Sequence, residues 1–163
     1  MTDYVQQSGS VTPGHLASWT TDGVIQDAGF SYANTYGMLA SAVLGINFNS
    51  ANTDNPIPIN LPAGYTKYRV YQIIISGATA SLSTATCGVF TQPATAGLGV
   101  VATGTAITVT QTAGDANQNM QSLTIVDQNT LALIDTTLFF RVQSPQGTAA
   151  LGNVTVFYQP LIA

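Results

Sequence analysis

The most regular part of the chain is a series of short β-like runs that begins at about Ala40. Runs rich in Val, Ile, Thr and Tyr alternate with turns marked by Gly, Pro and Asn, at a spacing of about 8–12 residues that is typical of a β-sandwich or barrel. Hydrophobic positions nowhere follow a capped helical period over any length. The pattern therefore predicts an all-β domain over residues 41–163.

The predicted strands are Ala42–Phe48, Pro56–Leu61, Tyr65–Ser76, Ser81–Thr91, Leu98–Ala102, Ala106–Thr110, Gln121–Val126, Thr137–Ser144 and Val154–Gln159. The second run contains two prolines, which restrict it to an edge or a lead-in because proline has no N–H for the ladder. The third run is the strongest. Strict alternation along it predicts Tyr68 and Gln72 on one face, and Tyr71 and Ile73 on the other.

Residues 1–37 have a different composition, in which Gly, Ser, Thr, Asn and Gln dominate and no hydrophobic period is sustained. Aromatic and aliphatic residues are nevertheless scattered through this segment, whereas a disordered tail is usually poor in aromatics. Two interpretations stay open: an attachment arm that orders against a partner, or a loop segment packed on its own domain. The candidate partner-binding residues of the arm are Pro13, His15, Trp19, Val24 and Ile25.

Trp19 is the expected anchor, because buried Trp residues are enriched among interface hot spots. Ordering the arm costs about 1–2 kcal/mol per residue in backbone entropy, which a few anchors do not offset. The arm must also gain backbone hydrogen bonds, most simply by adding a strand to a neighbour's sheet.

The charge content narrows the function classes. Only 6% of the 163 residues are Asp, Glu, Lys or Arg, against about 25% in a typical soluble domain. Interface cores are depleted in Lys, Glu and Asp, so this composition favours a subunit of an assembly. No basic cluster is present for nucleic acid, and neither a signal peptide nor a membrane-spanning run is recognised. A single cysteine, Cys87, excludes an intrachain disulfide and is expected to be a small buried hydrophobe.

Candidate chemistry is sparse, and we expect no catalytic residue, no metal and no cofactor. His15 has no evident triad partner, and no nucleophile elbow is present. The carboxylates that could pair for glycan hydrolysis lie in segments rich in turn-forming residues, where Asp commonly stabilises a turn. They are Asp54, Asp115, Asp127 and Asp135. Calcium ligands are conceivable at Asn52–Asn55 or Asp115–Asn117, but a full calcium-binding loop is missing.

Two stretches carry a resemblance to a known group of proteins. The first is Ser8–Gly29, SGSVTPGHLASWTTDGVIQDAG; the second is the pair Lys67–Phe90 and Leu138–Tyr158. Together they resemble small structural proteins of tailed bacteriophages, notably capsid decoration (cement) proteins with a jelly-roll domain. The resemblance implies an N-terminal attachment arm over residues 1–40 and an eight-stranded jelly-roll β-sandwich over residues 41–163.

The same resemblance implies a function: a non-enzymatic subunit that binds across neighbouring capsid proteins and stabilises the shell. Its expected partners are the major capsid protein and further copies of itself, as a homodimer or homotrimer. It would be synthesised in the bacterial cytoplasm and lie on the outer capsid surface of the virion. The alternative is a receptor- or glycan-binding module of a tail or head fibre, with a stacking platform formed by Tyr65, Tyr68, Tyr71 and Tyr158.

Overall fold

The computed structural model describes residues 38–110, 119–126 and 132–161 in full, together with the backbone of three strands near the N-terminus. Contacts between residues divide the chain into two compact units, Met1–Met38 and Leu39–Ala163. No helix of the described residues is long and apolar enough to cross a membrane.

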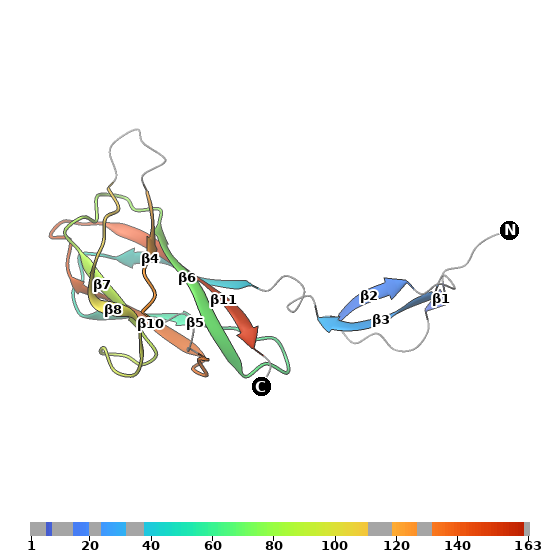
Figure 1. Ribbon diagram of the computed structural model, residues 1–163. Helices are drawn as coiled ribbons and strands as arrows, with labels where there is room; N and C mark the ends of the chain where they lie inside the picture. The colour runs from blue at the N-terminus through green and yellow to red at the C-terminus, as the bar shows by residue number, and fades with distance from the viewer. Residues whose placement is uncertain are drawn as a thin grey trace. The chain divides into compact units, whose positions relative to one another are not determined.

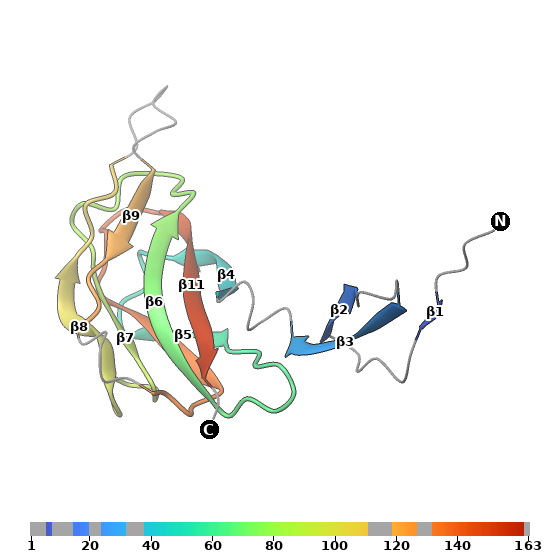
Figure 2. The ribbon, with the colours of Figure 1, turned by 45° about the vertical axis from the view of Figure 1, so that its right-hand side comes forward.

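Eight strands build the larger unit: β4 (Leu39–Asn47), β5 (Thr53–Pro58), β6 (Lys67–Ser76), β7 (Thr86–Phe90), β8 (Gly99–Ala106), β9 (Met120–Leu123), β10 (Thr137–Ser144) and β11 (Leu151–Leu161). They form two four-stranded sheets with the orders β5-β10-β7-β8 and β4-β11-β6-β9. Figure 1 shows the two layers, and Figure 2 shows β9, β6 and β11 side by side. Every pairing within these sheets is antiparallel, so the predicted all-β sandwich is confirmed.

The strand order is that of a jelly roll, in which the chain passes back and forth between two sheets. Within these two four-stranded sheets, only β7 and β8 are both paired and consecutive in the chain. The first strand of the unit, β4, pairs with the last, β11, and β5 pairs with β10. This order brings residues about 80 to 120 positions apart into register, which positions the surfaces described below.

The core lies between the sheets and is filled by the inward-facing positions of all eight strands. Phe48, just after β4, meets Phe140 of the opposite sheet edge to face, with ring centroids 5.7 Å apart. Tyr68 and Tyr158 make a second edge-to-face pair at 5.6 Å. Aromatic pairs of this geometry add about 0.5–1.5 kcal/mol beyond the area that they bury.

The strict alternation predicted for β6 is wrong at its middle. Tyr68, Val70, Ile73 and Ile75 are all buried, so the inward phase shifts by one residue between positions 70 and 73. The pairing with β11 is irregular at the same place, because Val70 and Gln72 face consecutive residues of β11. This extra residue is a β-bulge, which turns Ile73 inward instead of outward.

Two further predictions concern strands near the sheet edges. The proline-containing run is confirmed as an edge strand, because β5 pairs only with β10. The separate strand predicted at Ala106–Thr110 is wrong: β8 ends at Ala106. Beyond it the backbone is held instead by the bonds Ile107 N–H to Ala85 O and Leu82 N–H to Val109 O.

The smaller unit contains β1 (Gln6–Gln7), β2 (His15–Trp19) and β3 (Val24–Ser31). They form a sheet of their own with the order β1-β3-β2, in which β2 and β3 are antiparallel and β1 is parallel to β3. The sequence pattern predicted no strand in this segment, because its apolar residues do not alternate with polar ones over any length.

Candidate interaction surfaces

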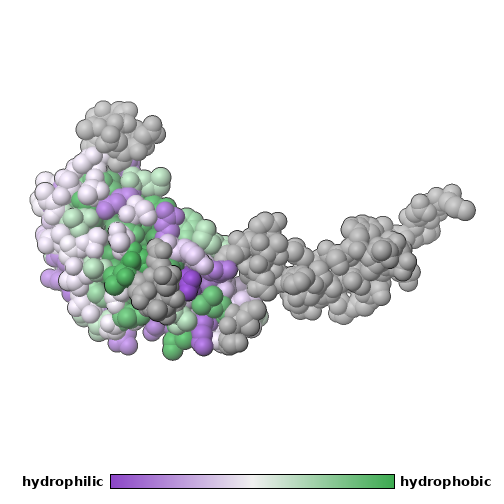
Figure 3. Space-filling view, in the orientation of Figure 1, coloured by the Kyte–Doolittle hydropathy of each residue, from purple (hydrophilic) through white to green (hydrophobic). Residues whose placement is uncertain are grey.

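The outer face of the β4-β11-β6-β9 sheet is uncharged over its centre. Cross-strand register builds one row from Ala42, Thr155, Ile74 and Ser122, and the next from Ala40, Phe157 and Gln72. Outward-facing cations occur only where β6 begins, at Lys67 and Arg69. We call these two central rows the open face. The side of the larger unit seen in Figure 3 is mostly pale to green, with strongly hydrophilic residues scattered over it.

A bulge in the edge strand β4 displays one apolar side chain beside the open face. Val43 pairs with Val154 and Ile46 with Gly152, so Leu44 and Gly45 are accommodated in a register shift. Gly45 adopts φ 67°, which favours glycine, and its N–H donates to Asn153 Oδ1 at 3.0 Å. Leu44 is 73% exposed in consequence.

The outer face of the other sheet carries an ion pair instead. Arg141 lies between the buried residues Phe140 and Val142, so its side chain is on the outer side of β10. Its Nη1 donates to Asp54 Oδ1 of β5 at 2.8 Å, and the two side chains are only 13% and 22% exposed. Its Nη2 donates to Asn52 Oδ1 at 3.3 Å. Because the pair is partly buried, it contributes more to stability than an exposed ion pair would.

An aromatic ring covers the same face beside the ion pair. Phe90 is opposite Phe139 in the register and is 4% exposed. A Cβ at Gly88 would lie 2.7 Å from Phe90 Cζ, so the ring rests on this glycine. A side chain at position 88 would therefore displace the ring.

The loop between β7 and β8, residues 91–98, reaches across this sheet. Ala94 N–H donates to Asp54 Oδ2 at 2.9 Å, although Asp54 is on β5, two strands away from β7. The loop therefore passes over the outer side of β10. We call residues 91–98 the strap and the surface beneath it the covered face.

The tip of the strap is a turn in an unusual conformation. Ala96 N–H donates to Pro93 O at 3.2 Å, and the central residues Ala94 and Thr95 have φ values of 56° and 64°. Positive φ at both central positions is the type I′ pattern, which favours Asn and Gly. The left-handed region costs residues with a Cβ about 1–2 kcal/mol each, and a β-branched residue there is a genuine outlier.

Several contacts hold this turn besides the bond to Asp54. At its base Thr91, which is buried, accepts a bond from Leu98 N–H at its Oγ1, at 3.0 Å. Thr91 N–H donates to Leu98 O at 3.1 Å. Gly97 adopts φ 72°, and a Cβ on it would lie 2.5 Å from Thr91 Oγ1. The strap is thus fixed at its base and at its tip.

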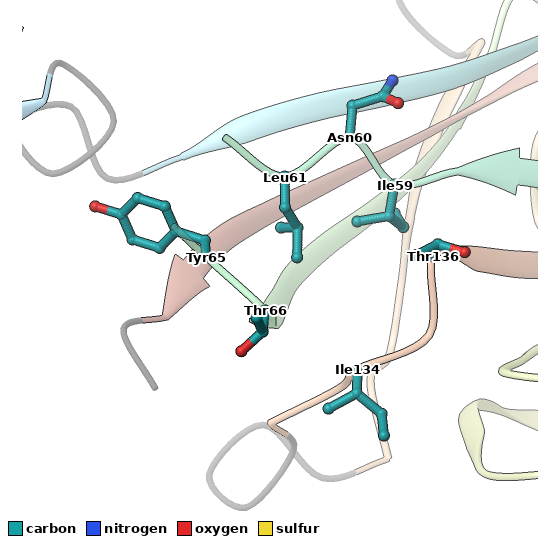
Figure 4. Close-up of a pocket in the computed structure, with 7 residues that line it drawn as sticks. All are labelled: Ile59, Asn60, Leu61, Tyr65, Thr66, Ile134 and Thr136. Carbon is teal, nitrogen blue, oxygen red and sulfur yellow. The ribbon is translucent and has the colours of Figure 1, made fainter. Parts of the chain in front are cut away.

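A shallow groove of about 620 Å³ lies where β5 ends and β6 begins. Its lining residues are Ile59, Asn60, Leu61, Tyr65, Thr66, Ile134 and Thr136. Figure 4 shows Ile59 and Leu61 directed the same way, with the ring of Tyr65 turned away from them. Tyr158 supports the groove from the core, since its hydroxyl donates to Asn60 O and accepts from Asn60 N–H, at 3.0 and 3.1 Å.

The four tyrosines predicted as a stacking platform do not form one. Tyr68 and Tyr158 are buried in the core, whereas Tyr71 is exposed on β6 and Tyr65 lines the groove. Burial raises the pKa of Tyr68 above its ordinary value, and the charge of Asp135 raises it further. Burial also raises the pKa of Tyr158, while its bond with Asn60 works in the opposite direction.

Of the predicted arm residues, His15 and Trp19 lie on β2, and Val24 and Ile25 lie on β3. Trp19 and Ile25 are register partners in the antiparallel pairing of these strands. The structure thus brings two of the predicted anchors to neighbouring positions of one small sheet. Pro13 lies outside the described residues.

Among the candidate carboxylates, Asp54 has a structural role. Asp54 is engaged by Arg141 and by Ala94 N–H, while Asp115 and Asp127 lie outside the described residues. Within the described part of the chain, no three His, Cys, Asp or Glu side chains gather into a metal-binding group. Cys87 is buried as predicted, and burial raises the pKa of its thiol to about 12.

The sequence pattern did not predict the strap, the groove or the exposure of Leu44. The isolated Gly45 inside a strand pattern is a recognised sign of a bulge and could have indicated the last of these. Neither a protein-family model nor a curated protein matches this chain. The structure itself establishes the fold as an all-β two-sheet sandwich. Any function must be inferred from the surfaces of this chain.

Proposed function

We propose that this protein is a non-enzymatic structural subunit of a tailed-bacteriophage particle, a capsid decoration subunit that stabilises the shell from its outer surface. The observation that carries the proposal is the open face. A sheet face whose central rows hold Ala, Thr, Ile, Phe, Gln and Ser has little to lose on leaving water, because no charge needs to be desolvated there.

The resemblance of Ser8–Gly29 and of the two hairpin-like stretches to phage virion proteins supports the same proposal. In this function the open face contacts the major capsid protein, and the N-terminal arm contacts a neighbouring subunit. Further copies of the chain complete a homodimer or homotrimer. A subunit that binds only the assembled shell stabilises it by mass action. The protein is made in the bacterial cytoplasm and resides on the virion.

The test is co-sedimentation of the full-length protein with host shells that lack it. Saturable binding is expected, and Ala42→Lys on the open face is expected to weaken it tenfold or more, because the new charge would be buried without a partner. Thr103→Lys, exposed on β8 of the other sheet, adds the same charge as a matched control and is expected to bind normally. Trp19→Ala is expected to weaken binding with a normal melting transition.

Failure of the unaltered protein to bind shells would reject the proposal, and equal weakening by both lysine substitutions would reject the open face as the contact. The groove favours a second candidate function, recognition of a host receptor or glycan by a fibre module. Its mixture of Asn60, Thr66 and aliphatic side chains suits a partly apolar sugar face. Binding to host cells without binding to shells would favour this second function.

A further inference from the structure

The strap presents side chains in a conformation for which glycine would be the more stable choice. Elsewhere the same unit places at positive φ mainly glycine, at Gly64, Gly77, Gly104 and Gly147, and once Asn52, a residue type that tolerates this region. At the tip of the strap it has Ala94 and Thr95 instead, in consecutive left-handed positions. A turn that served only to connect β7 with β8 would gain stability from glycine.

The surrounding contacts over-determine this strained turn. Asp54 binds the tip through Ala94 N–H and is itself held by Arg141, while Thr91 closes the base with two bonds to Leu98. Strain of this kind persists only where its surroundings enforce it, and it clusters at ligand clamps and similar sites. Residues 92–98 are all exposed and uncharged, and Leu98 is 47% exposed.

We propose that the strap is a preformed recognition loop, with Gln92, Thr95 and Leu98 as its contact residues. The partner that it fits is an uncharged protein surface with hydrogen-bonding groups for Gln92 and Thr95 around an apolar depression for Leu98. This inference rests on the proposed function: the partner is another subunit of the shell, a neighbour of the one that the open face contacts. A loop that is already ordered binds more tightly, because it loses less conformational freedom on binding.

The experiment separates the strain from the contact. In the full-length protein, Thr95→Gly relieves the strained position and removes the side chain. The melting temperature is expected to rise by about 2–4 °C, while affinity for host shells lacking the protein falls tenfold or more. Gln92→Ala and Leu98→Ala are expected to weaken shell binding severalfold without changing the melting temperature. Thr103→Ala, an exposed position on β8, serves as the control and should change neither quantity.

The outcomes are distinguishable from those of the proposed function. If Thr95→Gly raises the melting temperature and leaves shell affinity unchanged, the strap is a structural loop and the inference is overturned. A melting temperature that does not rise would overturn the premise that the turn is strained. If the unaltered protein does not bind shells at all, the proposed function fails and the partner assigned to the strap fails with it.

Discussion

The two sheets of the larger unit have similar inner faces, but their outer faces differ in what occupies them. Both bury aliphatic and aromatic residues against a common core. On the β5-β10-β7-β8 sheet the strap, the Phe90 ring and the Asp54–Arg141 pair occupy the outer side. On the β4-β11-β6-β9 sheet the central rows are uncharged, and their residues are exposed or half-buried within the described part of the chain. The difference shows that the exposure of a sheet face depends on the loop that crosses it as well as on the side chains of its own strands.

The comparison also separates stability from interaction. Beneath the strap, Asp54 bonds to Arg141 and to Ala94 N–H, although Arg141 Nε is buried without a hydrogen-bond partner, so the residues of the covered face contribute mainly to folding. On the open face Gln72 Nε2 donates to Ser122 Oγ at 3.2 Å, but most of the side chains in its two rows are exposed, so substitutions there should affect association more than folding. Each of the following predictions tests one side of this contrast.

The largest effect on stability is expected in the core that both sheets share. Phe140→Ala should lower the free energy of unfolding by about 3–5 kcal/mol, because the ring is fully buried and its removal leaves a cavity against Phe48. Phe157→Ala, on the open face, should cost about 1 kcal/mol or less. Urea unfolding measures both. Equal losses would mean that the open face is packed as tightly as the core.

A smaller effect is expected from the ion pair beneath the strap. Asp54→Asn should lower the free energy of unfolding by about 1–3 kcal/mol, because it weakens the charged hydrogen bond to Arg141 and the bond to Ala94 N–H. It should also increase hydrogen exchange at Ala94, measured by NMR. Exchange that stays as slow as in the unaltered protein would show that the strap is held without Asp54.

The smallest effect at neutral pH concerns the thiol buried behind the covered face. Burial raises the pKa of Cys87 to about 12, against about 8.5 in an unfolded chain. Between these values the unfolded state binds fewer protons at this thiol than the folded state, so the contribution of Cys87 to stability should be constant below about pH 8 and decrease as the pH rises above it. The midpoint of urea unfolding, followed from pH 7 to pH 10, measures this pH dependence of stability.

Cys87→Ala is the control for the alkaline prediction, because it should remove the part of the decline that begins near pH 8.5. The native protein should also resist a thiol reagent at pH 8 and react after unfolding. Rapid labelling of the folded chain would contradict the burial of this thiol.

Much of the larger unit could be predicted because local pattern decides it. The strand Thr137–Ser144 is found with its predicted bounds, and the prolines of β5 indicated an edge. The bulge at Tyr71 and Gln72 could not be predicted, because it is set by pairing with β11, some 85 residues later in the chain. The smaller unit was not predicted as a sheet, since its strands lack the alternation on which such predictions depend.

The candidate surfaces follow the same division. Low charge content indicated an interaction surface, and it could be read from composition alone. Composition could not predict which of the two outer faces is crossed by a loop, because strands of both sheets have similar Thr- and Val-rich sequences. The pairing of Asp54 with Arg141 joins residues 87 positions apart, and no local signal connects them.

The sequence by itself determined the β class, the approximate strands and the scarcity of charge, because alternation and composition act over a few neighbouring residues. Only the tertiary structure decided which strands are neighbours, and therefore which face stays open and which is covered. Jelly-roll pairing is almost entirely non-local, so register and loop placement depend on contacts between distant segments. The strained turn of the strap is the sharpest case, since its conformation contradicts its own residues and is held by Asp54 from a different strand.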